Sequence, residues 1–220
     1  KLILTCSGGP FYGRTAEELR SVTRSDALAH PNWSMGAKIT VDSATLMNKG
    51  LEIIEAMRLY DLPLAQVQAV IHRQSIVHSL VEFRDGALLA QLATADMRLP
   101  IRYALTYPNR AESPQEPLDL LTAPPLTFAA PDMAAFPCLR LAMEAAEEGG
   151  TACAILNGAN EEAVGLFLQE KIGFTGIADL VKTARERVLV KLNPTLADIL
   201  EADRLARQAV SDKWGEARPR

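Results

Sequence analysis

Asn48, Lys49 and Glu52 place an amide, an ammonium and a carboxylate close together in the sequence. Apolar residues at helical spacing predict a helix over 44–60. On that helix the three side chains project within about a third of the circumference. Ser43 stands at the predicted helix start, where free backbone N–H groups and the helix dipole favour an anion. The pattern predicts a phosphate pocket of Ser43, Asn48 and Lys49, beside a carboxylate of the kind that Mg²⁺ or Mn²⁺ prefers.

The same spacing is also typical of an ordinary solvent-exposed helix. Lys49 and Glu52 are three residues apart and could form a simple surface ion pair. Short motifs are weakly specific, so spacing alone favours this second interpretation. Both interpretations stay open at this point.

Two further segments contain candidate binding groups. Ser7-Gly8-Gly9 follows a predicted strand, and its small residues would let backbone N–H groups approach an anion. By itself, however, the segment is more typical of an ordinary turn, and it matches neither common nucleotide-binding fingerprint. His30 and Trp33 share a loop in which the indole could close over a ligand or anchor the loop to the core. A histidine there can donate to a phosphate or a hydroxyl.

Four other residues are assigned packing or structural roles. His72 and His78 fall in predicted strands. Met35 and Met97 are of a type that packs more often than it contacts a cofactor.

The elements that must position these residues follow from periodicity and turn signals. Asp85-Gly86 is a strong hairpin signal, and Asp42 or Ser43 suits the N-cap of the helix over 44–60. Strands are predicted over 1–5, 67–72, 75–84 and 87–93, a brief extended piece over 38–41, and further helices over 15–19, 25–29 and 96–107.

A proline-rich stretch divides the chain. Seven prolines lie between residues 108 and 137, a density that prevents regular elements. We therefore predict a first domain over 1–108, a linker over 109–137 and a helical bundle over 138–220. The bundle helices are predicted over 139–148, 159–170, 176–189 and 196–214, with Gly149-Gly150 ending the first and Thr195 capping the last. The predicted fold class is α+β, with a small mixed β-sheet and helices, a Pro-rich linker and a C-terminal four-helix bundle.

Composition excludes several classes of function. The net charge of −4 argues against a general nucleic-acid-binding surface, which needs clustered lysine and arginine. No apolar run approaches the ~20 residues of a membrane helix, and these residues show no basic-then-apolar leader pattern, so we expect neither a membrane-spanning nor a secreted protein. The three cysteines have no disulfide or zinc spacing, so we expect a reducing, cytoplasmic setting.

Several segments together resemble one family closely. They are Ser7–Phe11, His30–Gly36, Val41–Glu52, Ile71–Ser79, Asp96–Ile101 and Leu126–Phe128. This combination resembles the 1-deoxy-D-xylulose 5-phosphate reductoisomerases over essentially the whole chain. The resemblance implies a rearrangement of that ketose phosphate and its reduction by NADPH to 2-C-methyl-D-erythritol 4-phosphate, in non-mevalonate isoprenoid biosynthesis. It also implies a divalent cation, Mg²⁺, Mn²⁺ or Co²⁺, and a homodimer.

The resemblance also assigns roles to residues, and it makes residues 1–108 a catalytic, substrate-binding domain. It implies phosphate contacts by Ser7, Ser43, Asn48 and Lys49, a substrate contact by His30, a lid bearing Trp33, a metal- and substrate-facing Glu52, a cofactor contact by Gly36, and nicotinamide packing by Met35 and Met97.

Two parts of the family pattern are missing from these 220 residues. They are the NADPH-binding domain and the Asp-Ser-Glu segment that supplies the other metal ligands. We therefore expect the chain to be the central and C-terminal part of a longer protein, and to have no turnover alone. The alternative is a non-redox phosphosugar-binding or assembly module; a metal-dependent phosphatase or aldolase is a weaker one. A three-strand meander joined by the first strand would offer a sheet edge for dimerisation.

Overall fold

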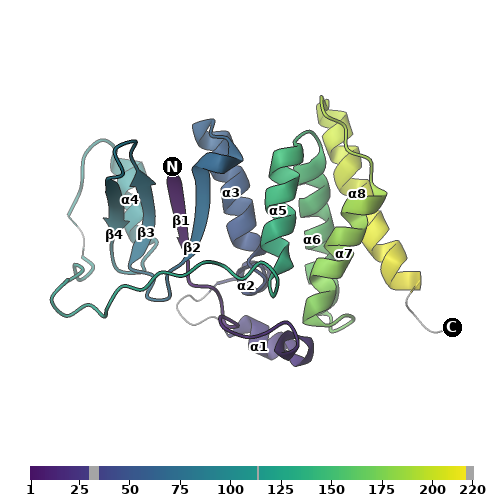
Figure 1. Cartoon of the computed structure of the whole chain (residues 1–220), viewed down its shortest axis with the longest axis horizontal. Helices are drawn as coiled ribbons and strands as arrows, with labels where there is room; N and C mark the ends of the chain where they lie inside the picture. Colours follow the sequence, from purple (N-terminus) through teal and green to yellow (C-terminus); the bar gives the residue numbers. More distant parts are fainter. Residues whose placement is uncertain (30–34, 113, 217–220) are drawn as a thin grey trace.

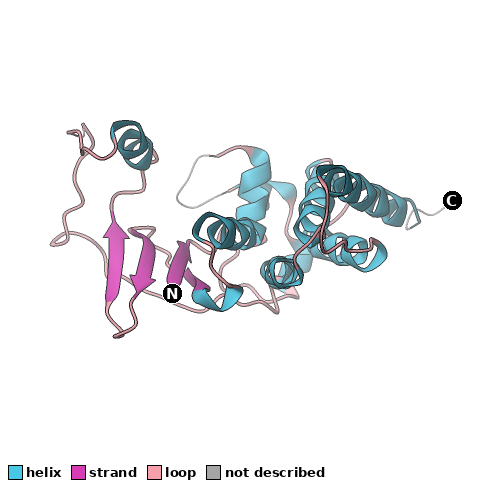
Figure 2. Cartoon of the chain, turned by 90° about the horizontal axis from the view of Figure 1, so that it is seen from above, coloured by secondary structure: helices cyan, strands magenta, loops and turns pink. Residues whose placement is uncertain are grey.

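A sheet at one end of the molecule and a group of helices at the other are joined through helix α3 (Met47–Tyr60) in the computed structural model (Figure 1). The structure describes residues 1–29, 35–112 and 114–216. Figure 2 shows the same separation of strands and helices from above. The α+β class predicted from the sequence is confirmed.

The sheet contains four strands in the order β2-β1-β3-β4. They are β1 (Leu2–Cys6), β2 (Val67–Ile71), β3 (Val77–Glu82) and β4 (Leu88–Leu92). Strand β1 runs parallel to β2 and antiparallel to β3, so the sheet is mixed, as predicted. The Asp85-Gly86 hairpin joins β3 to β4, with Gly86 at φ +86°. The expected meander is wrong, because β1 lies between β2 and β3.

The helices of the first half differ from the prediction around residue 40. The structure has η1 (Glu18–Ser21), α1 (Arg24–Leu28), α2 (Ala37–Ala44), α3, η2 (Leu64–Gln66) and α4 (Arg98–Thr106), where η marks a 3₁₀ helix. The predicted extended piece over 38–41 is wrong, because it lies inside α2. The helix predicted over 44–60 is confirmed over Met47–Tyr60, but its predicted start is wrong: Leu46 adopts a left-handed conformation at φ +62° and separates α2 from α3.

Four helices pack together at the C-terminal end, as predicted. They are α5 (Pro137–Glu148), α6 (Ala152–Leu168), α7 (Phe174–Arg187) and α8 (Leu196–Glu216). Helix α6 begins earlier than the predicted residue 159. Thr195 and Asp198 form a reciprocal cap at α8: Thr195 N–H donates to the carboxylate (2.7 Å), and Asp198 N–H donates to the threonine hydroxyl (3.3 Å).

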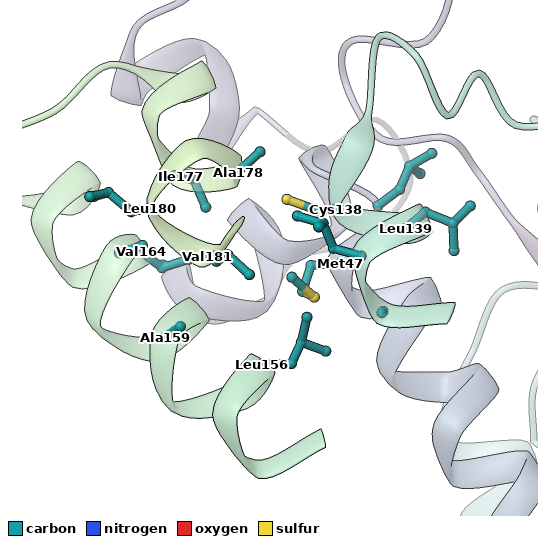
Figure 3. Packing of buried hydrophobic residues seen from close by; sticks show 14 of the residues in the cluster. Met47, Cys138, Leu139, Leu156, Ala159, Val164, Ile177, Ala178, Leu180 and Val181 are labelled. Atoms are coloured by element: carbon teal, nitrogen blue, oxygen red, sulfur yellow. The ribbon is translucent and has the colours of Figure 1, made fainter. Parts of the chain in front are cut away.

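One apolar core connects α3 with these helices. Met47 lies beside Cys138 and Leu139 of α5 and Leu156 of α6 (Figure 3). Gly50 permits the close approach of α3 and α5, since a β-carbon there would overlap the methyl group of Ala142. Because this core is shared, the position of α3 is fixed by the C-terminal helices.

The segment between α4 and α5 contains no helix or named strand in its described part, which omits residue 113. It runs past the sheet toward α5 (Figure 1) and forms one bridge with β2, in which Ile71 and Ala129 exchange backbone hydrogen bonds of 2.9 and 3.0 Å. None of the helices in the described ranges has both the length and the apolar character needed to cross a membrane.

Candidate functional site

A cavity of about 790 Å³ lies between the sheet, α2, α3 and α4. The predicted site residues Ser7, Ser43, Asn48, Lys49 and Glu52 all line it. They come from the end of β1 and from two successive helices, so the fold brings together groups that the sequence separates.

On α3, Glu52 accepts hydrogen bonds from both neighbouring polar residues. Asn48 Nδ2 donates to Oε1 at 2.6 Å, and Lys49 Nζ donates to Oε2. The Lys49 side chain is only 7% exposed, although that of Glu52 is 36% exposed. Lys49 therefore does not belong to a solvated helix face, and its charge is held at the cavity wall in an environment of low dielectric constant.

Ser43 reaches the cavity from a different element than predicted. It lies in the last turn of α2, and Ile39, one turn earlier on the same helix, lines the same cavity. The prediction that Ser43 or Asp42 caps the helix bearing Lys49 is wrong, because Leu46 is the residue at that N-cap. The anion site that the sequence placed at a helix N-terminus is thus not formed at Ser43.

The glycine segment after β1 packs directly on the end of α2. Gly8 and Gly9 have φ values of +78° and +67°, and a β-carbon on Gly9 would lie 2.8 Å from the carbonyl oxygen of Ser43. Gly9 N–H donates to Ser7 Oγ at 3.2 Å. Arg73 Nη1 donates to the carbonyl oxygens of Ser7 (2.6 Å) and Gly9 (2.7 Å). These contacts fix Ser7 beside Ser43.

The opposite wall of the cavity comes from α4 and the residues around it. Met97, Leu99 and Pro100 make it apolar, and Met35 lines the same cavity from the side of α2. The guanidinium of Arg110 lies 4.3 Å from the ring centre of Tyr103. Asp96 pairs with Arg98, and hydrogen bonds from that arginine lower the pKa of Asp96 to about 2.

His72 and His78 contact the backbone, as expected of structural residues. His72 is fully buried, its Nδ1 lies 2.9 Å from the Thr127 carbonyl oxygen, and its Nε2 accepts from Ile76 N–H. Nε2 is therefore the unprotonated nitrogen, and Nδ1 donates. His78 Nε2 lies 3.0 Å from the Ser75 carbonyl oxygen.

Some residues that line the cavity were not recognised as site residues from strand and helix patterns. They include Thr5, His72, Ser75, His78 and Gln91. The signal that could have found three of them is the motif resemblance over 71–79, which placed that segment with the site segments.

Two predicted site residues, His30 and Trp33, lie outside the described residues. Gly36 is described: it is the N-cap of α2, and its carbonyl oxygen accepts from Thr40 N (3.1 Å) and Thr40 Oγ1 (2.8 Å). It is exposed and does not line the cavity, so its cofactor contact stays a prediction.

Within 1–29, 35–112 and 114–216, no group of three His, Cys, Asp or Glu residues is placed to hold a metal ion. Glu52 is one carboxylate, already contacted by Lys49 and Asn48, and by itself it is not a cation site. Cys6 also lines the cavity, and burial raises the pKa of its thiol, so the thiol form is favoured there.

Two family models match the chain. The model described as DXP reductoisomerase C-terminal domain matches residues 92–209, and that described as 1-deoxy-D-xylulose 5-phosphate reductoisomerase C-terminal domain matches residues 1–60. The chain belongs to the 1-deoxy-D-xylulose 5-phosphate reductoisomerase family.

Individual reductoisomerases are similar along nearly all of this chain. Those of Acetivibrio thermocellus and Chlorobium phaeobacteroides are each 55% identical to it, over 96% and 94% of the chain. The matches cover 56% and 54% of those proteins. The chain thus spans about half the length of these curated relatives.

Solved reductoisomerase structures have the same fold. A crystal structure in complex with NADPH, fosmidomycin and magnesium is 46% identical, with a TM-score of 0.92 over 98% of this chain and 55% of that one. The Zymomonas mobilis enzyme in complex with NADPH is 42% identical, with a TM-score of 0.90 over 97% of this chain and 55% of that one.

Proposed function

We propose that the chain is the central and C-terminal part of a 1-deoxy-D-xylulose 5-phosphate reductoisomerase dependent on NADPH and a divalent cation. The family membership supports the activity, because relatives with that name match almost the entire chain. The observation that carries the proposal is the buried Lys49 in a cavity that also contains Ser7, Ser43 and Asn48. Residues 1–108 would form the substrate-binding domain, 109–137 a linker and 138–220 the bundle.

In this proposal the phosphate end of the substrate lies against Ser7, Ser43, Asn48 and Lys49. A buried ammonium group attracts a phosphate dianion more strongly than an exposed one, because water screens it less. The serine hydroxyls and the asparagine amide can donate to the remaining phosphate oxygens. His30 would contact the substrate, and Trp33 would cover it and exclude water.

Glu52 is proposed as one metal ligand, with the other ligands supplied from beyond the described residues. Mg²⁺ takes oxygen ligands in a near-octahedral arrangement, so a single carboxylate is only a part of such a site. When bound, the cation polarises the substrate carbonyl and keeps the substrate oxygens in place. Lys49 and Asn48 orient the Glu52 carboxylate on the cavity side of α3.

The NADPH contact is proposed for the apolar side of the cavity. Met97 lines that side and Met35 lines the same cavity from the side of α2, and thioether side chains adapt well to a flat ring such as nicotinamide. Gly36 is next to Met35 at the start of α2, so a backbone contact with the cofactor there remains part of the proposal. A non-redox phosphosugar-binding module would bind the sugar phosphate but would not transfer hydride from NADPH, and this difference distinguishes the two functions.

The phosphate pocket is tested by comparing Lys49→Ala with Lys182→Ala. Lys182 lies on α7 in an exposed ion pair with Glu186, so its removal takes away the same charge from outside the cavity. Lys49→Ala should weaken the binding of inorganic phosphate to the chain about 10- to 150-fold, the effect of losing a hydrogen bond to a charged group. Lys182→Ala should bind like the unsubstituted chain.

Titration followed by NMR or calorimetry measures both affinities, and circular dichroism checks that both variants fold. Equal affinities of the two variants would show that Lys49 does not contact phosphate. In the whole enzyme the same substitution should raise the KM for the sugar phosphate.

We also propose a cytoplasmic homodimer. In the described ranges β4 pairs only with β3, and Leu88 and Leu89 on β4 are 58% and 64% exposed, which suits burial against a second copy. Light scattering coupled to size exclusion should give twice the 23.9 kDa mass of one chain. A monomer mass at micromolar concentration would count against dimerisation through this edge.

A further inference from the structure

Helix α2 has two functional faces that point in different directions. Ile39 and Ser43 lie on the face that lines the cavity. Lys38 and Asp42 lie on the face that contacts Asn160 and Glu161 of α6. Asp42, which contacts α6, and Ser43, which lines the cavity, are therefore adjacent in the sequence.

The contact between α2 and α6 is a buried polar network. Asp42 is 1% exposed and Asn160 is fully buried. Asn160 Nδ2 donates to Asp42 Oδ1 at 2.9 Å, and Lys38 Nζ lies 2.7 Å from Asp42 Oδ2 and 3.0 Å from a Glu161 carboxylate oxygen. Burial raises the pKa of Asp42, and the hydrogen bonds from Asn160 and Lys38 oppose that rise.

A buried carboxylate is costly unless it is paired and hydrogen-bonded, and hydrogen-bond geometry is far more directional than apolar packing. Apolar contacts alone would let a helix of only eight residues slide or rotate with little change in energy. The hydrogen bond from Asn160 to Asp42 and the ion pair of Lys38 with Glu161 both cross from α6 to α2, and together they fix the rotation and the height of α2 against α6. Helix α2 is also held at its C-terminal end, because the Gly9 backbone packs against the carbonyl group of Ser43.

We propose that Asp42 and Asn160 are positioning residues for the phosphate pocket, acting through α2 on Ser43. Helix α6, one of the four helices of the C-terminal group, would then determine the position of the Ser43 hydroxyl relative to Asn48 and Lys49 on α3. This inference rests on the proposed function, since it assumes that Ser43 binds phosphate. Neither Asp42 nor Asn160 lines the cavity, so neither touches the ligand.

A purely structural role would lower the stability of the fold without a specific effect on Ser43. The double-mutant cycle separates the two roles. Asn160→Ala is measured in three backgrounds: the unsubstituted chain, Ser43→Ala and Asn48→Ala. Inorganic phosphate is the probe, and its affinity is measured by NMR titration of the chain. Ser211→Ala is the matched control, because the Ser211 hydroxyl donates to Glu162 on the other side of α6, at 2.9 Å.

Asn160→Ala should weaken phosphate binding about fivefold to tenfold in the unsubstituted chain and in Asn48→Ala. It should have no further effect in Ser43→Ala, because the residue through which it acts is gone. Ser211→Ala should lower the melting temperature without changing phosphate affinity. Asn160→Leu, which keeps nearly the volume of the side chain but has no amide to donate to Asp42, should reproduce the Asn160→Ala result and replaces it if that variant does not fold.

Two outcomes overturn the inference while leaving the proposed function intact. In one, Ser43→Ala and Asn48→Ala weaken phosphate binding but Asn160→Ala and Asn160→Leu do not. In the other, Asn160→Ala weakens binding equally in all three backgrounds. A chain that shows no saturable phosphate binding would instead reject the phosphate pocket, and the positioning role with it.

Discussion

Replacing Gly9 by alanine should damage both the fold and the site, because Gly9 combines a left-handed backbone with a close contact. Its φ is +67°, and an added β-carbon would lie 2.8 Å from the Ser43 carbonyl oxygen and 3.0 Å from Ala44 Cα. Both contacts are to backbone atoms of α2, so no flexible side chain can move aside. Either the glycine segment or the end of α2 must shift.

Comparison with a second glycine, Gly13, separates the cost of a left-handed backbone from the cost of the close contact. Gly13 also has a left-handed backbone, with φ +84°, but an added β-carbon there would meet nothing within 4 Å. Gly13→Ala should therefore cost only the left-handed conformation, about 1–2 kcal/mol of unfolding free energy. Gly9→Ala should cost about 1–3 kcal/mol more, the usual penalty of overpacking. For a chain of this length each kcal/mol lowers Tm by about 2–4 °C.

Thermal unfolding of both variants measures the stability difference, and phosphate titration measures the effect on the site. Gly13→Ala should retain the phosphate affinity of the unsubstituted chain, whereas Gly9→Ala should lose affinity because Ser7 and Ser43 are moved apart. Equal losses of stability in the two variants would refute the close contact between the glycine segment and α2. Unchanged phosphate affinity in Gly9→Ala would refute the role of that contact in the site.

Two further predictions concern titration and thiol reactivity. A hydrogen bond from Lys191, together with those from Thr195, lowers the pKa of Asp198 to about 2; its stabilising contribution is therefore present above the ordinary carboxyl pKa and is lost as the pH falls toward 2. Urea unfolding should show Asp198→Asn less stable than the unsubstituted chain at pH 6, with the difference shrinking as the pH falls from about 4 toward about 2; a constant difference would contradict this. Burial raises the pKa of Cys138 to about 12, so a thiol reagent at pH 8 should label it only after unfolding, and peptide mapping that finds it labelled in the folded chain would contradict its burial.

The face formed by Asn48, Lys49 and Glu52 was predictable from the sequence, because all three residues lie within one uninterrupted helix. Their angular relation depends only on helical geometry, which does not change with tertiary context. Burial of Lys49 was not predictable, because it depends on how α3 sits between the sheet and α5. Local spacing alone therefore could not decide between a solvated helix face and a cavity wall.

The segment before that helix shows why its start was misplaced. The residues Ile39, Thr40 and Val41 are β-branched and favour an extended chain, yet they form α2 because tertiary packing overrides a weak propensity. Neither glycine nor proline marks the break at Leu46, which takes a left-handed conformation that its own side chain disfavours. The strain is tolerated because the Leu46 side chain is buried, 3% exposed, between two packed helices.

Long-range pairing explains both the wrong strand order and the site that it creates. A hairpin signal such as Asp85-Gly86 is local and was correctly interpreted, whereas the insertion of β1 between β2 and β3 joins residues more than sixty positions apart. Because β1 and β2 are parallel, their carboxyl ends meet at one edge, and Ser7 and Arg73 follow directly from those ends. The same non-local pairing that the sequence did not reveal therefore places the glycine segment against α2 and closes that side of the cavity.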